Sequence, residues 1–328
     1  MTVTLERIEQ PRLPAVPEYP TTSPWNKQID ATQRLFADEL ASTEGWEDLG
    51  EKQGVRLSRK YRENDSNPVP VARGETLVEG VEPYAFLAGI VQPPEMRKLW
   101  DARTETGSII QRYSRNEVLF HAVTKGTKMV ASPRDISGIQ KNYVLDDGSC
   151  MIVQTSVETN DIPELRHTKR ANLGLSGFLF KPEGPNTRVV YIFQIDLRGS
   201  IPSQVVSMVA AETPLCIGRA RDLFYARGCA PYVRHDGSPE PAVVFQTETV
   251  NPDTKSREYR CTVTTGSKTG DHFEIAYDAQ RMYRQEGGVE VSVEGDTAAV
   301  EVQDNGKGVV QVVTQASGKT LTVVLRPK

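Results

Sequence analysis

The chain has 328 residues, which is long enough for two domains, since a domain usually holds about 100–200 residues. Its composition is that of an ordinary folded protein, with 38% hydrophobic and 25% charged residues. The net charge of −4 comes from acidic and basic residues mixed along the whole length, so no basic stripe favours a nucleic-acid partner.

The first element that we expect is a flexible, proline-rich arm over residues 1–27. This segment holds five prolines and few large apolar residues, so it cannot bury enough surface to offset the entropy lost on ordering. A helix follows, because Ile29, Leu35, Phe36 and Leu40 recur on one face of the segment.

Strands and two short helices are predicted next. The strands cover residues 55–61 and 73–81, and the helical stretches cover 83–91 and 93–101. The second stretch opens on Pro93 and Pro94, and proline suits a first helical turn because its missing N–H would be unpaired there. Six further strands are expected over 109–115, 117–123, 135–145, 149–158, 173–182 and 187–197.

A long closing helix is predicted over residues 201–228, where the apolar period changes. Pro214 should kink it, at a cost of about 3 kcal/mol if unrelieved, because the ring removes one hydrogen bond and crowds the previous turn. Helices with a run of antiparallel strands indicate an α+β domain over residues 28–236.

The last part of the chain, residues 237–328, reads as a separate all-β domain. Seven short strands with glycine-rich turns between the later ones are typical of a small immunoglobulin-like sandwich. The expected strands cover 242–250, 257–265, 272–278, 289–293, 297–303, 308–315 and 320–326.

The four cysteines lie far apart, with no CxxC pair and no histidines at zinc spacing, so we expect no metal and no cofactor. A chain of this size needs no disulfide scaffold, which favours a reducing compartment. The first residues lack the apolar run of a signal peptide, and nowhere do about 18 apolar residues follow one another. We therefore expect a cytoplasmic protein.

Four motifs occur in order across about 180 residues: MRKLWD (96–101), SPRDISGIQ (132–140), QIDLRGSIP (194–202) and ETPLCIGRARDLF (212–224). Together they resemble the START family of lipid-transfer domains. The resemblance implies a helix-grip fold, in which a curved antiparallel sheet surrounds a hydrophobic tunnel closed by the C-terminal helix. It also implies that the chain binds one lipid (a sterol, a ceramide-like lipid or a phospholipid), transfers or senses it, and touches membranes transiently.

The same resemblance indicates ligand contacts. Six positions after Arg134 stands Gln140, where sterol-carrying relatives tend to have arginine and the ceramide carrier has glutamine. The carboxylate that partners this arginine in those relatives falls near His121, so the sequence departs from their acid–base pair. This departure argues against cholesterol and is compatible with a neutral hydroxyl or amide head group. Asn172 and Thr213 lie where the ceramide carrier has polar contacts. Further candidate contacts are Arg134, Val205, Met208 and Val209.

Each candidate also has a purely structural interpretation. A histidine in a strand is more often a satisfied core or surface residue than a ligand contact. Arg134 and Asp135 are better explained as a structural pair that stabilises the sheet, and Asp196 as fixing the turn into the closing helix.

The loop over residues 160–170 is the candidate lid over the tunnel mouth. Its segment Ile162–Arg170 and the closing helix would gate the ligand, and its basic residues could face lipid phosphates. The alternative is a solvated turn, because short charge clusters are usually surface decoration. The basic cluster comprises Arg166, His167, Lys169 and Arg170.

Two other functions stay open at this point. A helix-grip enzyme, a cyclase or hydrolase acting on a hydrophobic small molecule, would need a positioned acid–base pair or nucleophile. The sequence contains no GxSxG, HExxH or phosphate-loop motif, and we predict no catalytic residues. The other is a lipid-regulated scaffold that binds a protein partner through the C-terminal β domain.

Overall fold

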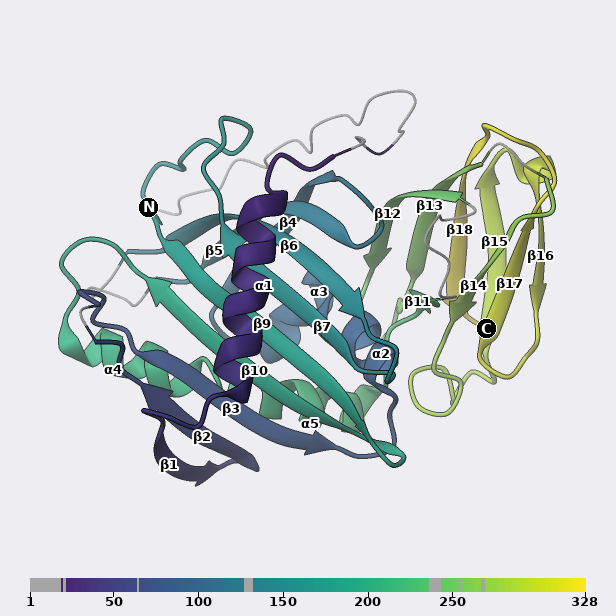
Figure 1. Cartoon of the computed structure of the whole chain (residues 1–328). Coiled ribbons are helices and arrows are strands. Elements are labelled where there is room, and N and C mark those ends of the chain that lie inside the picture. Colours follow the sequence, from purple (N-terminus) through teal and green to yellow (C-terminus); the bar gives the residue numbers. More distant parts are fainter. Residues whose placement is uncertain are drawn as a thin grey trace, which may run out of the picture.

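The computed structural model describes Tyr19 and residues 22–63, 65–126, 132–235, 243–253, 255–266 and 269–328. Within these ranges the chain forms an α+β module followed by a β-rich module (Figure 1). Most of the predicted arm over 1–27 lies outside the described residues. The boundary predicted between residues 236 and 237 lies outside them as well.

Helices and strands of the first module follow the predicted order. Its helices are α1 (Asn26–Ala41), α2 (Pro83–Phe86), the π-helical η1 (Leu87–Val91), α3 (Pro94–Trp100), α4 (Ser203–Glu212) and α5 (Cys216–Arg227). Its strands are β1 (Glu47–Lys52), β2 (Val55–Lys60), β3 (Val71–Val78), β4 (Thr104–Arg112), β5 (Glu117–Thr124), β6 (Arg134–Val144), β7 (Cys150–Ser156), β8 (Lys169–Arg170), β9 (Asn172–Glu183) and β10 (Asn186–Asp196).

These strands form one sheet in the order β1-β2-β3-β10-β9-β7-β6-β5-β4. Neighbours along this path are antiparallel, and the short β8 adds to β6 in parallel. The predicted antiparallel sheet is thereby confirmed. The edge strand β1, whose residues are all exposed, is an addition that the sequence pattern did not predict, because it has no buried face.

The two faces of the sheet bury different cores. Helix α1 crosses one face (Figure 1), where Ile29 and Phe36 pack with Leu119 and Ile139. A methyl group at Gly177 would overlap the Phe36 ring, so glycine lets the helix approach the sheet closely. The opposite face is covered by η1 and α2 to α5, and its core contains a large aromatic group: Phe86, Trp100, Phe178, Phe180, Tyr191 and Phe224.

Two helices rather than one continuous helix close the first module. Helix α4 ends at Glu212 and α5 begins at Cys216, so the break falls around Pro214. This matches the predicted position of the disruption, since proline removes a helical hydrogen bond and crowds the preceding turn. None of the described helices is both long and apolar enough to span a membrane.

The second module consists of two four-stranded sheets in the orders β11-β14-β17-β16 and β12-β13-β18-β15, as expected for a sandwich. Phe245 and Phe273 meet edge to face between the sheets, with ring centroids 5.4 Å apart. The strands are β11 (Tyr232–Val233), β12 (Val243–Val250), β13 (Tyr259–Thr265), β14 (His272–Ala276), β15 (Val289–Gly295), β16 (Val300–Asp304), β17 (Val309–Thr314) and β18 (Thr320–Pro327), with a 3-10 turn η2 (Thr297–Ala299).

The β-rich module packs directly on the first module. Ala230 N–H donates to Gly89 O in η1 at 3.1 Å, and Arg112 Nε donates to Gln246 O in β12 at 3.0 Å. The hydroxyl of Tyr19 bonds both the carbonyl and the amide of Phe245, each at 2.9 Å. These contacts join the two modules on the side of η1 and the β4–β5 hairpin.

Candidate functional site

A partly open cavity of about 150 Å³ lies on the face of the sheet opposite α1. One water molecule needs roughly 10–15 Å³ on this measure, so the space could hold several waters or part of a larger ligand. Its wall comes from α3, strands β4 to β7, β9 and β10, and the C-terminal end of α4. Apolar side chains from these elements dominate the wall, among them Ile152, Phe178, Tyr191, Phe193 and Val209.

Five polar side chains form a continuous hydrogen-bonded chain along this apolar wall. Ser176 Oγ donates to Gln154 Oε1 at 2.9 Å, and Gln154 Nε2 donates to Gln140 Oε1 at 2.7 Å. Gln140 Nε2 donates to Asn142 Oδ1 at 3.1 Å, and Asn142 Nδ2 donates to Gln92 Oε1 at 2.9 Å. We call this set the amide chain; it links β9, β7, β6 and the residue after η1.

Strand geometry and the π-helical turn place the amide chain. Side chains alternate along β6, so Gln140 and Asn142 share the cavity face. The N–H of Gln92 bonds Leu87 O, five residues back, at 2.8 Å, and this wide turn ends directly before two prolines. Each amide group has two N–H donors. The bonds above use only one donor each of Gln154, Gln140 and Asn142, which leaves polar hydrogens for a ligand.

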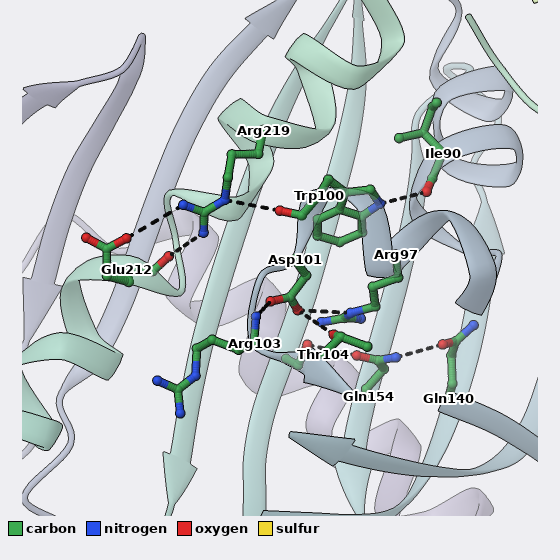
Figure 2. A network of polar contacts seen from close by, with 11 residues as sticks. Ile90, Arg97, Trp100, Asp101, Arg103, Thr104, Gln140, Gln154, Glu212 and Arg219 are labelled. Atoms are coloured by element: carbon green, nitrogen blue, oxygen red, sulfur yellow. Dashed lines mark hydrogen bonds and ion pairs between the residues drawn. The ribbon is translucent and has the colours of Figure 1, made fainter. Parts of the chain in front are cut away.

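Arg97 on α3 and Asp101, the residue that follows α3, form an ion pair that borders the same cavity. Figure 2 shows this pair. Arg97 Nε lies 3.2 Å from Asp101 Oδ2, one helical turn later. Asp101 also accepts bonds from the Arg103 N–H at 3.1 Å and from the Thr104 hydroxyl at 3.0 Å. The Arg97 guanidinium lies over the Trp100 ring, 5.2 Å from its centroid. The carboxylate is thus held by three donors.

Arg97 remains charged in this setting. Burial disfavours its charged form, but the Asp101 carboxylate outweighs that effect and raises the pKa of Arg97 above its usual value. About 25% of the Arg97 side chain stays exposed, and the residue borders the cavity. Its terminal nitrogens have no hydrogen-bond acceptor among the described residues, so they can donate to a ligand oxygen.

Behind the pair, Trp100 and Arg219 connect α3 to neighbouring helices (Figure 2). Trp100 Nε1 donates to Ile90 O in η1 at 3.0 Å, and Arg219 Nε donates to Trp100 O at 3.1 Å. Arg219 also lies 3.6 Å from the Glu212 carboxylate at the end of α4. The charged pair is therefore held on a rigid support.

Arg134 and Asp135, interpreted from the sequence as a structural pair, each have structural partners but do not pair with each other. Arg134 borders the cavity, and its Nε donates to Leu197 O, in the turn before α4, at 2.8 Å. Asp135 points to the other face and pairs with Arg170 at 2.8 Å and with His121 at 3.1 Å. Adjacent residues of a strand face opposite sides, so these two side chains cannot share a partner easily.

His121 and Gln140 do not point to a common site. Gln140 is the register partner of Val118 on β5, so these two side chains lie on the same face of the sheet. His121 is three residues after Val118, so its side chain lies on the opposite face, together with that of Leu119. Its imidazole bonds the fully buried Asp135 on the face that carries α1. The backbone of this strand borders the cavity, but the geometry assigns the His121 side chain to the opposite face.

The other predicted contacts divide into two groups. Thr213 and Val209 border the cavity at the C-terminal end of α4. Asn172 is exposed and lies outside the cavity wall, so the structure does not support a contact there. Val205 and Met208 pack into the core on the same helix but do not border the cavity.

The candidate lid, residues 160–170, does not border the cavity either. Ile162 is buried in the core on the α1 face, and Arg170 is held by Asp135 and by Ile162 O. The remaining basic residues, Arg166, His167 and Lys169, are exposed. The loop is therefore anchored through Ile162 and Arg170, and its exposed positive charge lies between and beside these anchors.

Sequence reasoning missed Arg97, Gln154, Ser176 and Gln92 as site residues. One signal was present, because Arg97 and Asp101 stand four residues apart in MRKLWD, the spacing of an intrahelical ion pair. The described residues contain no group of three or more potential metal ligands.

The chain is similar in sequence to a known domain family and to proteins that contain its domain. A family model described as "START domain" matches residues 26–215. Residues of the chain are 25% identical to an Arabidopsis thaliana "Protein ENHANCED DISEASE RESISTANCE 2-like" over 186 residues, 53% of this chain and 26% of that protein. They are 23% identical to the Danio rerio "Steroidogenic acute regulatory protein, mitochondrial" over 128 residues, 38% of this chain and 45% of that protein. The chain thus spans less than half the length of these curated relatives.

Two solved structures share the fold. "Human StAR-related lipid transfer protein 5" superposes with a TM-score of 0.55 at 22% identity, covering 61% of this chain and 97% of that chain. Human STARD10 gives a TM-score of 0.52 at 20% identity, covering 62% of this chain and 82% of that chain. These similarities confirm the predicted helix-grip fold, and the β-rich module follows it in the chain.

Proposed function

Because this chain belongs to the START domain family, we propose that it binds a single lipid in the cavity and transfers it between membranes. The observation that carries the proposal is a polar strip inside an apolar cavity. An unpaired buried polar group costs about 1–3 kcal/mol, so a chain retains such groups where they serve packing or a ligand. Here the amide chain and Arg97 keep hydrogen-bond donors directed at the cavity.

The proposed head-group site combines Arg97 with the amide chain. Arg97 offers the charge-assisted donors of its guanidinium, and Gln140 on β6 and Gln154 on β7 offer amide N–H groups in the same cavity wall. The apolar part of the lipid would lie along Phe178, Tyr191 and the aliphatic wall. This arrangement fits the general pattern of ligand sites, in which a few fixed polar groups orient a mostly apolar molecule.

The proposed exit lies beneath α4. Val209 and Thr213 close the cavity there, and Arg134 ties the preceding turn to β6. Movement of α4 would uncover the cavity without disturbing the sheet, because α4 is separated from α5 by the break around Pro214. Transfer then requires only that this helix opens when the protein meets a membrane.

The test is lipid uptake from donor vesicles and delivery to acceptor vesicles, followed with a panel of labelled sterol, ceramide and phospholipid. The wild-type protein should take up one lipid per chain and accelerate its transfer. Arg97→Met should bind that lipid at least tenfold more weakly, because a lost charge-assisted hydrogen bond costs about 1.5–3 kcal/mol. Arg188→Met removes an exposed arginine paired with Glu183 and should behave as wild type. Uptake that is equal in all three proteins would contradict the head-group assignment.

A further inference from the structure

The wall of this cavity carries more positive than negative charge. One carboxylate, Asp101, borders it, and that carboxylate is engaged by Arg97. Among the described residues, three further arginines of the cavity wall form no ion pair with a carboxylate. These are Arg103, Arg115 and Arg134.

The three arginines differ in how they are used. Arg115 belongs to the interface with the β-rich module, because it donates to Val233 O at 3.1 Å and lies over the Phe245 ring. Arg134 donates only to neutral oxygens, among them Leu197 O. The backbone N–H of Arg103 donates to Asp101 Oδ1, and its backbone C=O accepts from the Lys125 N–H. The Arg103 guanidinium, in contrast, has no hydrogen-bond partner among the described residues. Figure 2 shows the Arg103 side chain extending away from Asp101.

Arg103 and Arg134 lie at the same end of the cavity. Thr104, next to Arg103, is the register partner of Thr124 on β5, and Thr124 is the partner of Arg134 on β6. Burial lowers the pKa of Arg134. Burial also lowers the pKa of Arg103; Asp101 opposes this in part, and the positive charge of Arg134 adds to it. A buried and a partly buried cation that repel each other are stabilised by an anion between them.

We infer that Arg103 and Arg134 form an anion-binding subsite of the cavity. This subsite binds an oxyanion of the bound lipid, which is either a carboxylate or a phosphate group. The planar fork of Arg103, which has no hydrogen-bond partner among the described residues, matches the two oxygens of such a group, and Arg134 adds a second positive charge beside it. The inference rests on the proposed function and narrows it, because it assigns the ligand an acidic group at the α4 end in addition to the polar atom met by the amide chain. Arg134 would contact the anion while it also holds the turn before α4.

The test compares palmitate with hexadecanol, two ligands of equal chain length that differ in the charged group, by isothermal titration calorimetry on the full chain. The variants are Arg103→Gln and Arg103→Lys. The matched control is Lys125→Gln, which removes a positive charge from the exposed residue that follows β5, outside the cavity wall. Inorganic phosphate is titrated separately.

The wild-type protein should bind palmitate at least tenfold more tightly than hexadecanol. Arg103→Gln should lose that preference while hexadecanol affinity is unchanged, Arg103→Lys should restore part of it, and Lys125→Gln should keep it. Equal binding of the two ligands by the wild type, or equal effects of Arg103→Gln and Lys125→Gln, would overturn the subsite. Phosphate that binds as tightly as palmitate would overturn the assignment to a lipid. A wild-type protein that binds neither ligand nor any lipid of the panel contradicts the proposed function itself, which separates the two failures.

Discussion

Gln154 Nε2 lies 2.7 Å from Gln140 Oε1, and the two residues are register partners on β7 and β6. Each glutamine makes a second side-chain hydrogen bond: Gln154 accepts one from Ser176, and Gln140 donates one to Asn142. Every side chain of the amide chain is therefore oriented by its hydrogen-bonded neighbours. A cavity with preoriented polar groups can select a ligand without first rearranging its wall.

Replacing Gln140 with leucine should interrupt the amide chain at its centre. The variant leaves the Gln154 N–H and the Asn142 carbonyl without their partner, so we expect lipid affinity to fall by about 1–3 kcal/mol, with unfolding free energy falling by a similar amount. Lipid titration and urea unfolding measure the two effects. Gln311→Leu makes the same change in the cross-strand Gln303–Gln311 pair of the β-rich module and should leave lipid affinity unchanged. Unchanged affinity in a folded Gln140→Leu protein would remove Gln140 from the site.

Arg134→Lys should loosen the turn before α4. Lysine cannot reproduce the fork that bonds Leu197 O and Ser132, although it keeps the positive charge. We expect amide hydrogens between residues 197 and 212 to exchange about fivefold faster or more, the effect of losing roughly 1 kcal/mol of local stability. Hydrogen exchange with mass spectrometry measures this. The control Arg198→Lys changes an exposed arginine of the same turn, and an equal effect there would refute the specific anchor.

Asp135 should make stability depend on pH under acidic conditions. Burial alone would raise the pKa of Asp135, but hydrogen bonds and charge from Arg170 and His121 lower it overall. A carboxyl whose folded pKa is lowered stabilises the protein above its unfolded pKa of about 3.9, and this contribution is lost as pH falls through the folded pKa. Asp135→Asn should therefore lose about 3–5 kcal/mol at pH 7, and the difference from wild type should narrow below about pH 4.

Urea unfolding between pH 2 and 7 checks this prediction for Asp135. Asp222→Asn, an exposed aspartate on α5 that pairs with its neighbour Arg221, should stay close to wild type throughout. A difference between Asp135→Asn and wild type that persists unchanged down to the lowest pH would show that the carboxylate charge is not the cause.

Gly89→Ala should weaken the contact between the two modules. A methyl group at this position would meet Cys229 Cβ at 2.7 Å and Ala230 O at 2.8 Å, both at the junction with the β-rich module. Overpacking of this kind costs about 1–3 kcal/mol, which urea unfolding detects. Gly174→Ala on β9 has its nearest neighbour at 3.7 Å and should cost less than 1 kcal/mol. Equal costs for the two variants would argue against the packed junction.

Much of the fold could be predicted from the sequence because it depends on periodicity. The alternating strands β3 to β7, β9 and β10, the break at Pro214 and the β-rich module all follow from apolar patterns and turn residues. The exposed strand β1 could not be predicted, because it has no buried face and therefore no alternation of apolar and polar residues. β11 also escaped prediction, since two residues paired with β14 are too short to show alternation.

The candidate site was predicted less completely, for a geometrical reason. Gln140 and Thr213 border the cavity as expected, yet His121 was paired with Gln140 although strand register places them on opposite faces. A motif gives sequence spacing but not which strand lies opposite which. The members of the amide chain outside β6 are residues 92, 154 and 176, brought together only by the strand order β9-β7-β6 and the turn after η1.

The most direct test of lipid binding is native mass spectrometry of the purified protein, followed by extraction and identification of what it carries. We predict one lipid per chain, retained under gentle conditions and lost or exchanged in the Arg97→Met variant. A protein that is purified empty, and that takes up no sterol, ceramide, phospholipid or fatty acid from a broad panel, would contradict the account.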